Sequence, residues 1–282
     1  MKITEVYSLL VEPMQYSFMQ RSLIVAILVG LLCAIVGSYL MVQRLSLLGD
    51  AISHSVMPGL AIAFNLEAPM LLGALIAAII STITIAWIND QFPLKEDTAI
   101  GIVFASFFAL GIILITSIQK EHKIDLNHFL FGNILGVTAE DVINTAIITA
   151  IVLFIIIVTY KELLFYTFDI LGAATIGLPV KILKFGLMTL VALTTVASMK
   201  AVGVVLVLAL LIIPTATAYL LVSRLHEVMT IGAALGIFSS IAGMYASYFY
   251  NIPSGPAIVM VSSICFILVL IKDSIKQYLK LH

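Results

Sequence analysis

The chain has 282 residues, of which 62% are hydrophobic and only 10% are charged. A soluble globular domain is about half apolar and about a quarter charged, so this composition excludes an ordinary water-soluble globule. The formal net charge of −1 offers no basic surface of the kind that binds nucleic acid. The composition therefore predicts an all-α, polytopic integral membrane helical bundle whose apolar surface is covered by membrane lipid.

Long apolar segments recur along the whole chain, each close to the roughly 20 residues that a helix needs to cross a bilayer. Residues 1–21 lack the basic-then-apolar order of a signal peptide, so the first long segment is expected to stay as a span. The predicted transmembrane helices, in chain order, cover residues 22–43, 68–88, 98–118, 140–160, 181–199, 201–222, 228–249 and 255–271.

Two shorter apolar segments complete the pattern. Segment 51–64 begins after Asp50 and makes the expected total eight or nine transmembrane helices. Segment 126–137 is too short to span and is expected to form an interfacial or re-entrant helix. The sequence shows no repeat and no second soluble part, so we expect one transmembrane domain over residues 1–282.

Basic residues between the spans predict which loops face the cytoplasm. Three lysines follow the last span, and further basic residues lie around 161–184 and at Arg224. A cytoplasmic C-terminus puts loops 161–180 and 223–227 on the same, inner side and the turn at Lys200 outside. Counting further back puts Arg44 and 89–97 inside, and 65–67 and 119–138 outside. The side of the N-terminus depends on whether 51–64 crosses fully.

One polar cluster interrupts these apolar segments, within GDAISHSVMPG at residues 49–59. In a helix, Asp50 and His54 are four residues apart and share a face, with Ser53 and Met57 each three residues from one of them. A carboxylate with an imidazole suits a divalent first-row metal, and ionisable groups at membrane depth usually line a pathway. The pattern also allows a structural role, in which Asp50 caps the helix and His54 bonds a backbone carbonyl. Two ligands do not complete a tight metal site, so a second copy or mobile waters would be needed.

A second unusual segment is the loop at about 161–180, KELLFYTFDILGAATIGLPV. It is too polar and too broken to span, with Asp169, Gly172 and Gly177, yet it carries many large apolar side chains such as Phe168. An exposed loop of this kind favours either docking of a partner protein or an amphipathic helix at the lipid headgroups.

Several catalytic and nucleotide-binding motifs are absent from the sequence. It contains no G-x-x-x-x-G-K-[ST], G-x-S-x-G, H-E-x-x-H or C-x-x-C motif, so it predicts neither an enzyme nor an ATPase. If transport is driven by ATP, a partner chain must hydrolyse it. A stand-alone secondary carrier that uses Asp50 and His54 as a proton relay is the main rival, although no inverted repeat supports it. A membrane enzyme is a second rival, but no cluster of catalytic residues is visible.

These residues occur in stretches with a recognisable sequence pattern. The stretches are VGSYLMVQRLSLLGDAISHSVMPGLA at 36–61, DTAIGIVFASFFALGIILI at 97–115, HFLFGNILGV at 128–137, VGVVLVLALLIIPTATAYLL at 202–221 and YNIPSGPAIVM at 250–260. The chain resembles the permease subunit of metal-ion ATP-binding-cassette (ABC) importers that serve manganese, zinc and iron. The resemblance runs from about Phe18 to Leu270. The sequence of its motifs is closest to that of manganese permeases. Ser55 departs from the alanine expected at that position.

The resemblance implies a multi-pass protein of the bacterial plasma membrane that imports manganese, or alternatively zinc or iron. It implies a homodimer or a pair of similar permeases, two cytoplasmic ATP-binding subunits, and an extracytoplasmic metal-binding protein. In that family's pattern Asp50 and His54 line the metal path, and residues 165–178 form the coupling helix seated on the ATPase. The coupling residues are then Phe168, Asp169, Gly172 and Gly177. No permanently bound cofactor is expected; the metal is cargo.

Overall fold

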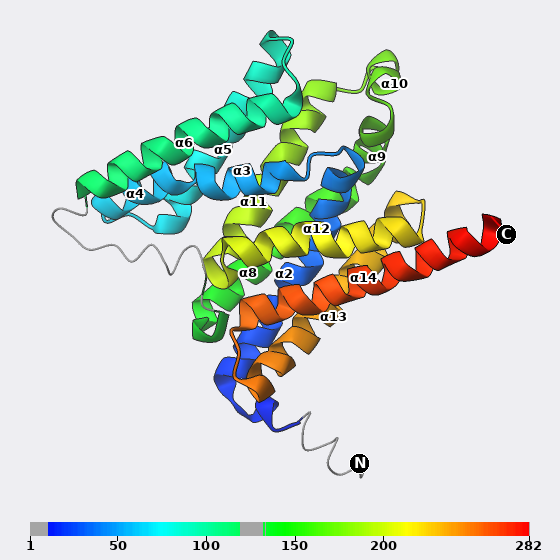
Figure 1. The fold of residues 1–282 in the computed structure, drawn as a ribbon. Helices are drawn as coiled ribbons and strands as arrows, with labels where there is room; N and C mark the ends of the chain where they lie inside the picture. Colours follow the sequence, from blue (N-terminus) through cyan, green and yellow to red (C-terminus); the bar gives the residue numbers. More distant parts are fainter. Residues whose placement is uncertain (1–10, 119–131, 133, 282) are drawn as a thin grey trace.

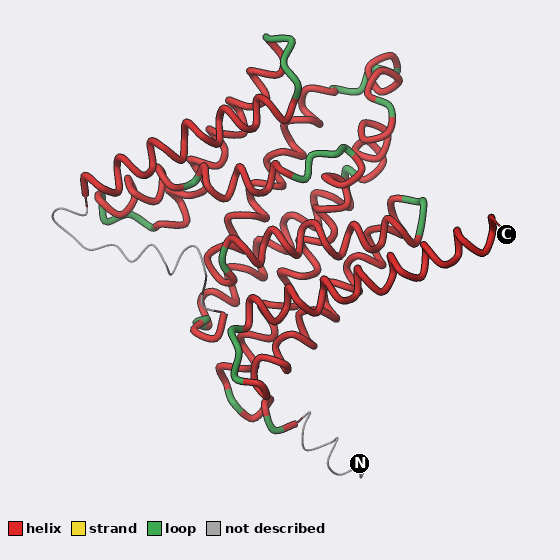
Figure 2. Tube along the Cα trace, viewed as in Figure 1, coloured by secondary structure: helices red, strands yellow, loops and turns green. Residues whose placement is uncertain are grey.

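A computed structural model describes residues 11–118, 132 and 134–281, and over these residues the chain is built from helices. The elements are η1 (Pro13–Gln15), α2 (Ser17–Val42), α3 (Leu47–Ser55), α4 (Met57–Asn65), α5 (Met70–Gln91), α6 (Glu96–Ile118), η2 (Ile134–Gly136), α8 (Ala139–Val158), α9 (Tyr160–Phe168), α10 (Ile170–Thr175), α11 (Val180–Val202), α12 (Val204–Leu221), α13 (Leu225–Tyr250) and α14 (Ser254–Leu281). Figure 1 and Figure 2 show how these helices are arranged.

Each predicted long span coincides with one long helix, which confirms the helical membrane fold. Within the described residues, nine segments are long and apolar enough to cross a membrane. The ninth is Leu47–Asn65, in which α3 and α4 follow one another, so the short segment predicted at 51–64 belongs to a longer, interrupted helix. The last helix runs ten residues beyond the predicted end at 271, because no proline or glycine stops it there.

The short helix predicted at 126–137 lies mostly outside the described residues. Only its C-terminal part is described, and there Ile134–Gly136 form a 3-10 turn. This turn packs on α2, where the Ser22 hydroxyl donates to the carbonyl oxygen of Ile134 at 2.7 Å.

The helices form two groups that α11 joins. In one group α2, α12, α13 and α14 pack together, with α2 largely buried at the centre. In the other group α3 and α4 lie against α5 and α6. Helix α11 contacts both α2 and α8 on one side and both α3 and α5 on the other. The cytoplasmic ends predicted from the lysines, at α9, α10 and the α5–α6 connection, lie at the same end of the bundle (Figure 1).

Close helix contacts depend on glycine, because lipid gives no hydrophobic drive for helices to associate and backbones must approach for dispersion contacts. A Cβ added to Gly59 in α4 would overlap the carbonyl oxygen of Gly73 in α5 and lie 2.7 Å from the Cβ of Ala77. A Cβ added to Gly73 would similarly overlap the Gly59 carbonyl and the Ala63 Cβ. Gly59 and Ala63 of α4 therefore pack closely within the chain, against α5.

Substituting Gly59 by alanine should destabilise the fold, because the new methyl group must push α4 and α5 apart. Overpacking of this kind costs about 1–3 kcal/mol. Gly101 provides the matched control, because it lies in helix α6 and a Cβ there meets nothing within 4 Å. Melting of the detergent-solubilised protein, followed by loss of monodisperse material on heating, should show a lower midpoint for Gly59→Ala and no decrease for Gly101→Ala. Equal midpoints would contradict the packing argument.

Candidate functional site

The candidate site lies where a membrane span is interrupted. Pro58 has no N–H group, so it cannot bond the carbonyl of His54 four residues earlier, and its ring would collide with that carbonyl in a continuous helix. Helix α3 accordingly ends at Ser55 and α4 begins at Met57, with Pro58 in its first turn. The break therefore falls at Val56, two residues after His54.

Asp50 and His54 face one another on α3. The Nε2 atom of His54 lies 3.5 Å from Oδ1 of Asp50, and the two side chains are 22% and 43% exposed, respectively. Helix α3 starts at Leu47, so Asp50 lies in its first turn rather than at the N-cap. The capping role that the sequence left open for Asp50 is therefore not the observed one. The pair presents a carboxylate and an imidazole together at a surface of the chain.

Aromatic rings from α6 enclose the other side of the imidazole. The ring centroids of Phe104 and Phe108 lie 5.5 Å and 5.3 Å from that of His54, and both rings cross it at steep angles. The two phenyl rings stack on one another at 5.9 Å. The Nδ1 atom of His54 is buried and has no hydrogen-bond partner, so it does not bond a backbone carbonyl as the alternative reading required. Sequence reasoning missed both phenylalanines, because an apolar residue in an apolar span gives no signal.

Ser53 and Met57 are buried in the chain. The Ser53 hydroxyl donates to the carbonyl oxygen of Gly49 at 2.8 Å, a common way for a membrane helix to satisfy a hydroxyl group. Met57 packs against α6, where a Cβ on Gly111 would lie 2.5 Å from the Met57 Cβ. The structure thus brings Asp50 and His54 together and orients Ser53 and Met57 into the packing, and a role for these two in a metal path stays a prediction.

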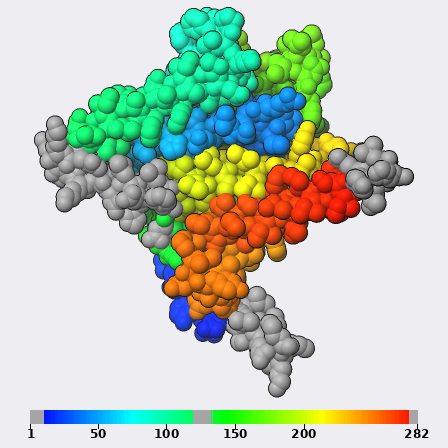
Figure 3. Space-filling model, in the orientation of Figure 1, coloured from blue at the N-terminus to red at the C-terminus, as the bar shows by residue number. Residues whose placement is uncertain are grey.

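The Asp50–His54 pair is sparse as a metal site. Over the part of the chain that the structure describes, no three His, Cys, Asp or Glu side chains gather as metal ligands. Figure 3 shows α3 and α4, in blue, as a band at the molecular surface between α6 and the yellow α12. Further carboxylate, imidazole or thiolate ligands would have to come from outside the described residues.

The predicted coupling segment folds into two short helices. Asp169 separates α9 from α10, and its Oδ1 atom accepts a 2.8 Å hydrogen bond from the backbone N–H of Gly172. A side chain at Gly172 would overlap the Asp169 carboxylate. Gly177, with φ of +84°, lies in the left-handed region just after α10, where glycine is favoured. These three residues therefore shape α10 and the turn that follows it.

Large apolar side chains of this segment face outward. Leu171 is 81% exposed and Phe168 is 60% exposed, and Ile170 and Ile176 are also exposed. A contiguous apolar surface at the end of a membrane bundle is typical of an interaction site.

A charged cluster ties α11 to the ends of α5 and α6. The Nζ atom of Lys184 lies 3.5 Å from Oδ1 of Asp90 and 3.7 Å from Oε1 of Glu96. Burial, together with the nearby carboxylates of Glu96 and Asp90, raises the pKa of Tyr166 in α9 to about 12. Tyr166 therefore stays neutral at physiological pH. This cluster could not be found by sequence reasoning, because Lys184 is far along the chain from Asp90 and Glu96.

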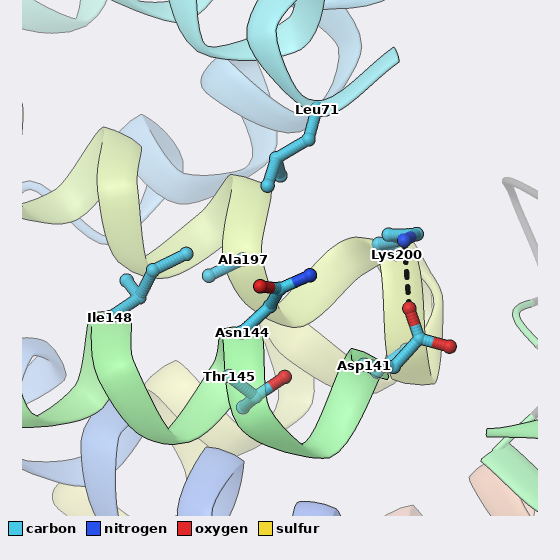
Figure 4. Close-up of a pocket in the computed structure, with 8 residues that line it drawn as sticks. Leu71, Asp141, Asn144, Thr145, Ile148, Ala197 and Lys200 are labelled. Carbon is cyan, nitrogen blue, oxygen red and sulfur yellow. Dashed lines mark ion pairs between the residues drawn. The ribbon is translucent and has the colours of Figure 1, made fainter. Parts of the chain in front are cut away.

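A small pocket lies at the opposite, predicted outer end, between α5, α8 and α11 (Figure 4). There Lys200 Nζ contacts Asp141 Oδ1 at 2.7 Å, which joins the C-terminal end of α11 to the first turn of α8. Asp141 also completes a capping box with Thr138. The pocket shares no residue with the Asp50–His54 pair. Its charged side chains, Lys200 and Asp141, form an ion pair with each other.

Comparison with known proteins assigns the chain to a family. Residues 15–273 match the model of the ABC 3 transport family. The chain belongs to this family. It is 56% identical over 272 residues to "Uncharacterized membrane protein in ycf23-apcF intergenic region" of Cyanophora paradoxa, covering 95% of this chain and 91% of the relative. The resemblance to permease subunits of metal-ion ABC importers is thereby confirmed at the level of the family.

Relatives with metal-transport names match over most of the chain. "Manganese transport system membrane protein MntC" of Halalkalibacterium halodurans is 44% identical, over 91% of this chain and 88% of that protein. "Chelated iron transport system membrane protein YfeD" of Yersinia pestis is 38% identical, over 96% and 90%. Among solved structures, "PsaBC from Streptococcus pneumoniae in complex with Fab" aligns with a TM-score of 0.83 at 37% identity, over 94% of this chain and 95% of the other.

The Asp169 cap gives a structural prediction for the coupling segment. Asp169→Ala removes the acceptor for the Gly172 amide, and loss of such a cap should raise hydrogen exchange in α10 by about fivefold. Asp169→Asn keeps a side-chain oxygen and should leave exchange close to that of the native chain. Exchange followed by mass spectrometry on peptides that cover α10 tests this, and equal rates for Asp169→Ala and the native chain would show that the cap is dispensable.

Proposed function

We propose that this chain is the membrane-spanning permease subunit of an ABC importer that moves Mn²⁺ into the cytoplasm. The observation that carries the proposal is the Asp50–His54 pair at an interrupted membrane span, in a family member whose relatives include proteins named for manganese transport. In the proposed mechanism two copies of the chain face one another, and two carboxylates and two imidazoles replace part of the water shell of the ion.

The sparse site suits passage rather than storage. Mn²⁺ is the weakest binder in the divalent series, so an oxygen-rich site with few protein ligands holds it briefly. A conducting site must bind well enough to admit the ion and loosely enough to release it. The exposure of Asp50 at the surface of a single chain supports completion of the site by a second copy.

The exposed apolar segment supports a partner on the cytoplasmic side. We propose that Phe168, Leu171 and their neighbours on α9 and α10 dock on an ATP-binding subunit, which hydrolyses ATP in place of this chain. An extracytoplasmic binding protein would deliver the ion at the other end. The loop lysines support a cytoplasmic C-terminus. The bacterial relatives support a location in the bacterial plasma membrane.

Packing connects the proposed docking surface with the proposed site. Tyr166 of α9 lies near the charges at the ends of α5 and α6, and α6 carries the two phenyl rings that touch His54. Movement of the coupling segment on ATP binding could therefore reach the metal site through α6, a rigid helix.

Removing either proposed ligand should abolish most transport. In a bacterium that lacks its own manganese importers, expressed with the cognate ATPase and binding protein, Asp50→Ala and His54→Ala should each lower ⁵⁴Mn²⁺ uptake by at least about tenfold, because loss even of a residue that only supports a metal ligand costs 10–100-fold. Asp97→Ala and His226→Ala are matched controls in exposed positions elsewhere and should retain uptake.

Competition identifies the metal in the same assay. Excess Zn²⁺ or Fe²⁺ that leaves ⁵⁴Mn²⁺ uptake intact supports manganese as cargo. Preferential uptake of ⁵⁵Fe²⁺ would instead favour the iron importer that the Yersinia pestis relative suggests. Normal uptake by both alanine variants would rule out the metal role of Asp50 and His54.

Dependence on the partner ATPase separates an ABC importer from a secondary carrier. Replacing the phosphate-binding lysine of the partner's P-loop by alanine should reduce uptake to background, because this chain has no nucleotide-binding motif. The permease level in the membrane, measured by immunoblot, controls for lost expression. Uptake that persists with the inactive ATPase, or is driven by a proton gradient alone, would favour the carrier.

A further inference from the structure

The surroundings of His54 differ from those of a typical metal-binding histidine. Such a histidine almost always donates its second ring N–H to a carboxylate, a backbone carbonyl or water, which fixes the ring and strengthens the bond to the metal. In this chain Nε2 points toward Asp50, and Nδ1 is buried without a hydrogen-bond partner. The groups found around the ring are the phenyl rings of Phe104 and Phe108.

A second copy of the chain does not change this environment. Nδ1 is buried within the protomer, whereas the Asp50 carboxylate, toward which Nε2 points, belongs to a side chain that is 43% exposed. A partner subunit or a metal can therefore reach the Nε2 side of the ring, and Nδ1 keeps the same aromatic neighbours. Because Phe104 and Phe108 are one turn apart on α6 and stack on each other, they form a rigid wall.

This arrangement raises the free energy of the metal-bound state relative to that of the metal-free state. Without metal, the ring proton can reside on Nε2 and point toward the Asp50 carboxylate. With metal on Nε2, the one proton of the neutral ring must reside on Nδ1, where no hydrogen-bond acceptor is found within the described residues. A buried donor without an acceptor is unfavourable, so the bound state is weakened relative to the free state.

We infer that Phe104 and Phe108 are positioning residues that hold His54 while withholding an acceptor from Nδ1, and so keep metal binding weak enough for release. The inference rests on the proposed role of His54 as a ligand to the transported ion. It explains why an aromatic pair, rather than a polar group, lies behind a histidine on an ion path. Transport then depends on a metal–imidazole bond that no hydrogen bond at Nδ1 strengthens.

Supplying the missing acceptor should tighten the site. Phe108→Gln places an amide oxygen behind the ring, and Phe108→Leu is the matched control that removes the phenyl group without adding an acceptor. We expect the glutamine variant to bind Mn²⁺ about tenfold more tightly than the leucine variant, the lower end of the effect of a supporting partner on metal affinity. In uptake assays the glutamine variant should show a lower KM together with a lower maximal rate.

The measurement is equilibrium binding of ⁵⁴Mn²⁺ to the purified permease–ATPase complex without nucleotide. Phe104→Gln and Phe104→Leu repeat the comparison from the other ring, in case one substitution prevents folding. Combining Phe108→Gln with His54→Ala should abolish the gain, which ties it to the imidazole. Equal affinities for the glutamine and leucine variants at both positions would overturn the inference, because loosened packing alone would affect both alike.

The same data separate failure of this inference from failure of the proposed function. If native binding is unchanged by Asp50→Ala and by His54→Ala, the pair is not the metal site and the inference fails with it. If those variants lose binding but glutamine and leucine behave alike, the metal site remains and only the role of the phenyl rings is wrong.

Discussion

The hydrocarbon interior of a membrane contains no water, so each backbone N–H and carbonyl there must find its partner within the protein. The long helices meet this requirement through hydrogen bonds within their own backbone. Polar side chains such as Ser38 donate a hydrogen bond to a carbonyl oxygen of the same helix. The interruption between α3 and α4 is therefore a costly feature, imposed by Pro58 one turn after His54. Its position defines the candidate site, because it brings α6 against the broken span through Gly111 and Met57.

Charge is distributed along the bundle in a way that fits this constraint. Lys184 is paired with two carboxylates at one end, and Lys200 is paired with Asp141 at the other. The Asp50–His54 pair lies between these ends on an interrupted span and is partly exposed, and within the described residues no Lys or Arg forms an ion pair with Asp50. Ionisable residues at such positions are expensive and usually functional. Residues at the ends of the bundle that form ion pairs have a structural role, whereas the Asp50–His54 pair between them is the candidate for transport.

Hydropathy predicted the long helices well, because a span requires nearly continuous apolar sequence and little else. It placed α3 poorly, since Asp50, Ser53 and His54 lower the local hydropathy of a segment that is nevertheless helical from Leu47. Helical spacing correctly put Asp50 and His54 on one face, but it could not tell that Ser53 bonds its own helix. The phenyl rings of Phe104 and Phe108 and the Lys184 cluster were beyond prediction, because they depend on how α6, α9 and α11 pack across the bundle.

The sparseness of the site follows from electrostatics as much as from coordination. A divalent cation in a medium of low dielectric needs compensating charge nearby, and one Asp50 supplies only half of it. Two copies of the chain would supply two carboxylates, which balance a dication without trapping it in a full protein cage. An imidazole with a well-supported N–H would strengthen the binding further and slow the exit of the ion. Aromatic walls behind His54 avoid that strengthening while still fixing the ring, so the same residues provide orientation and rapid release.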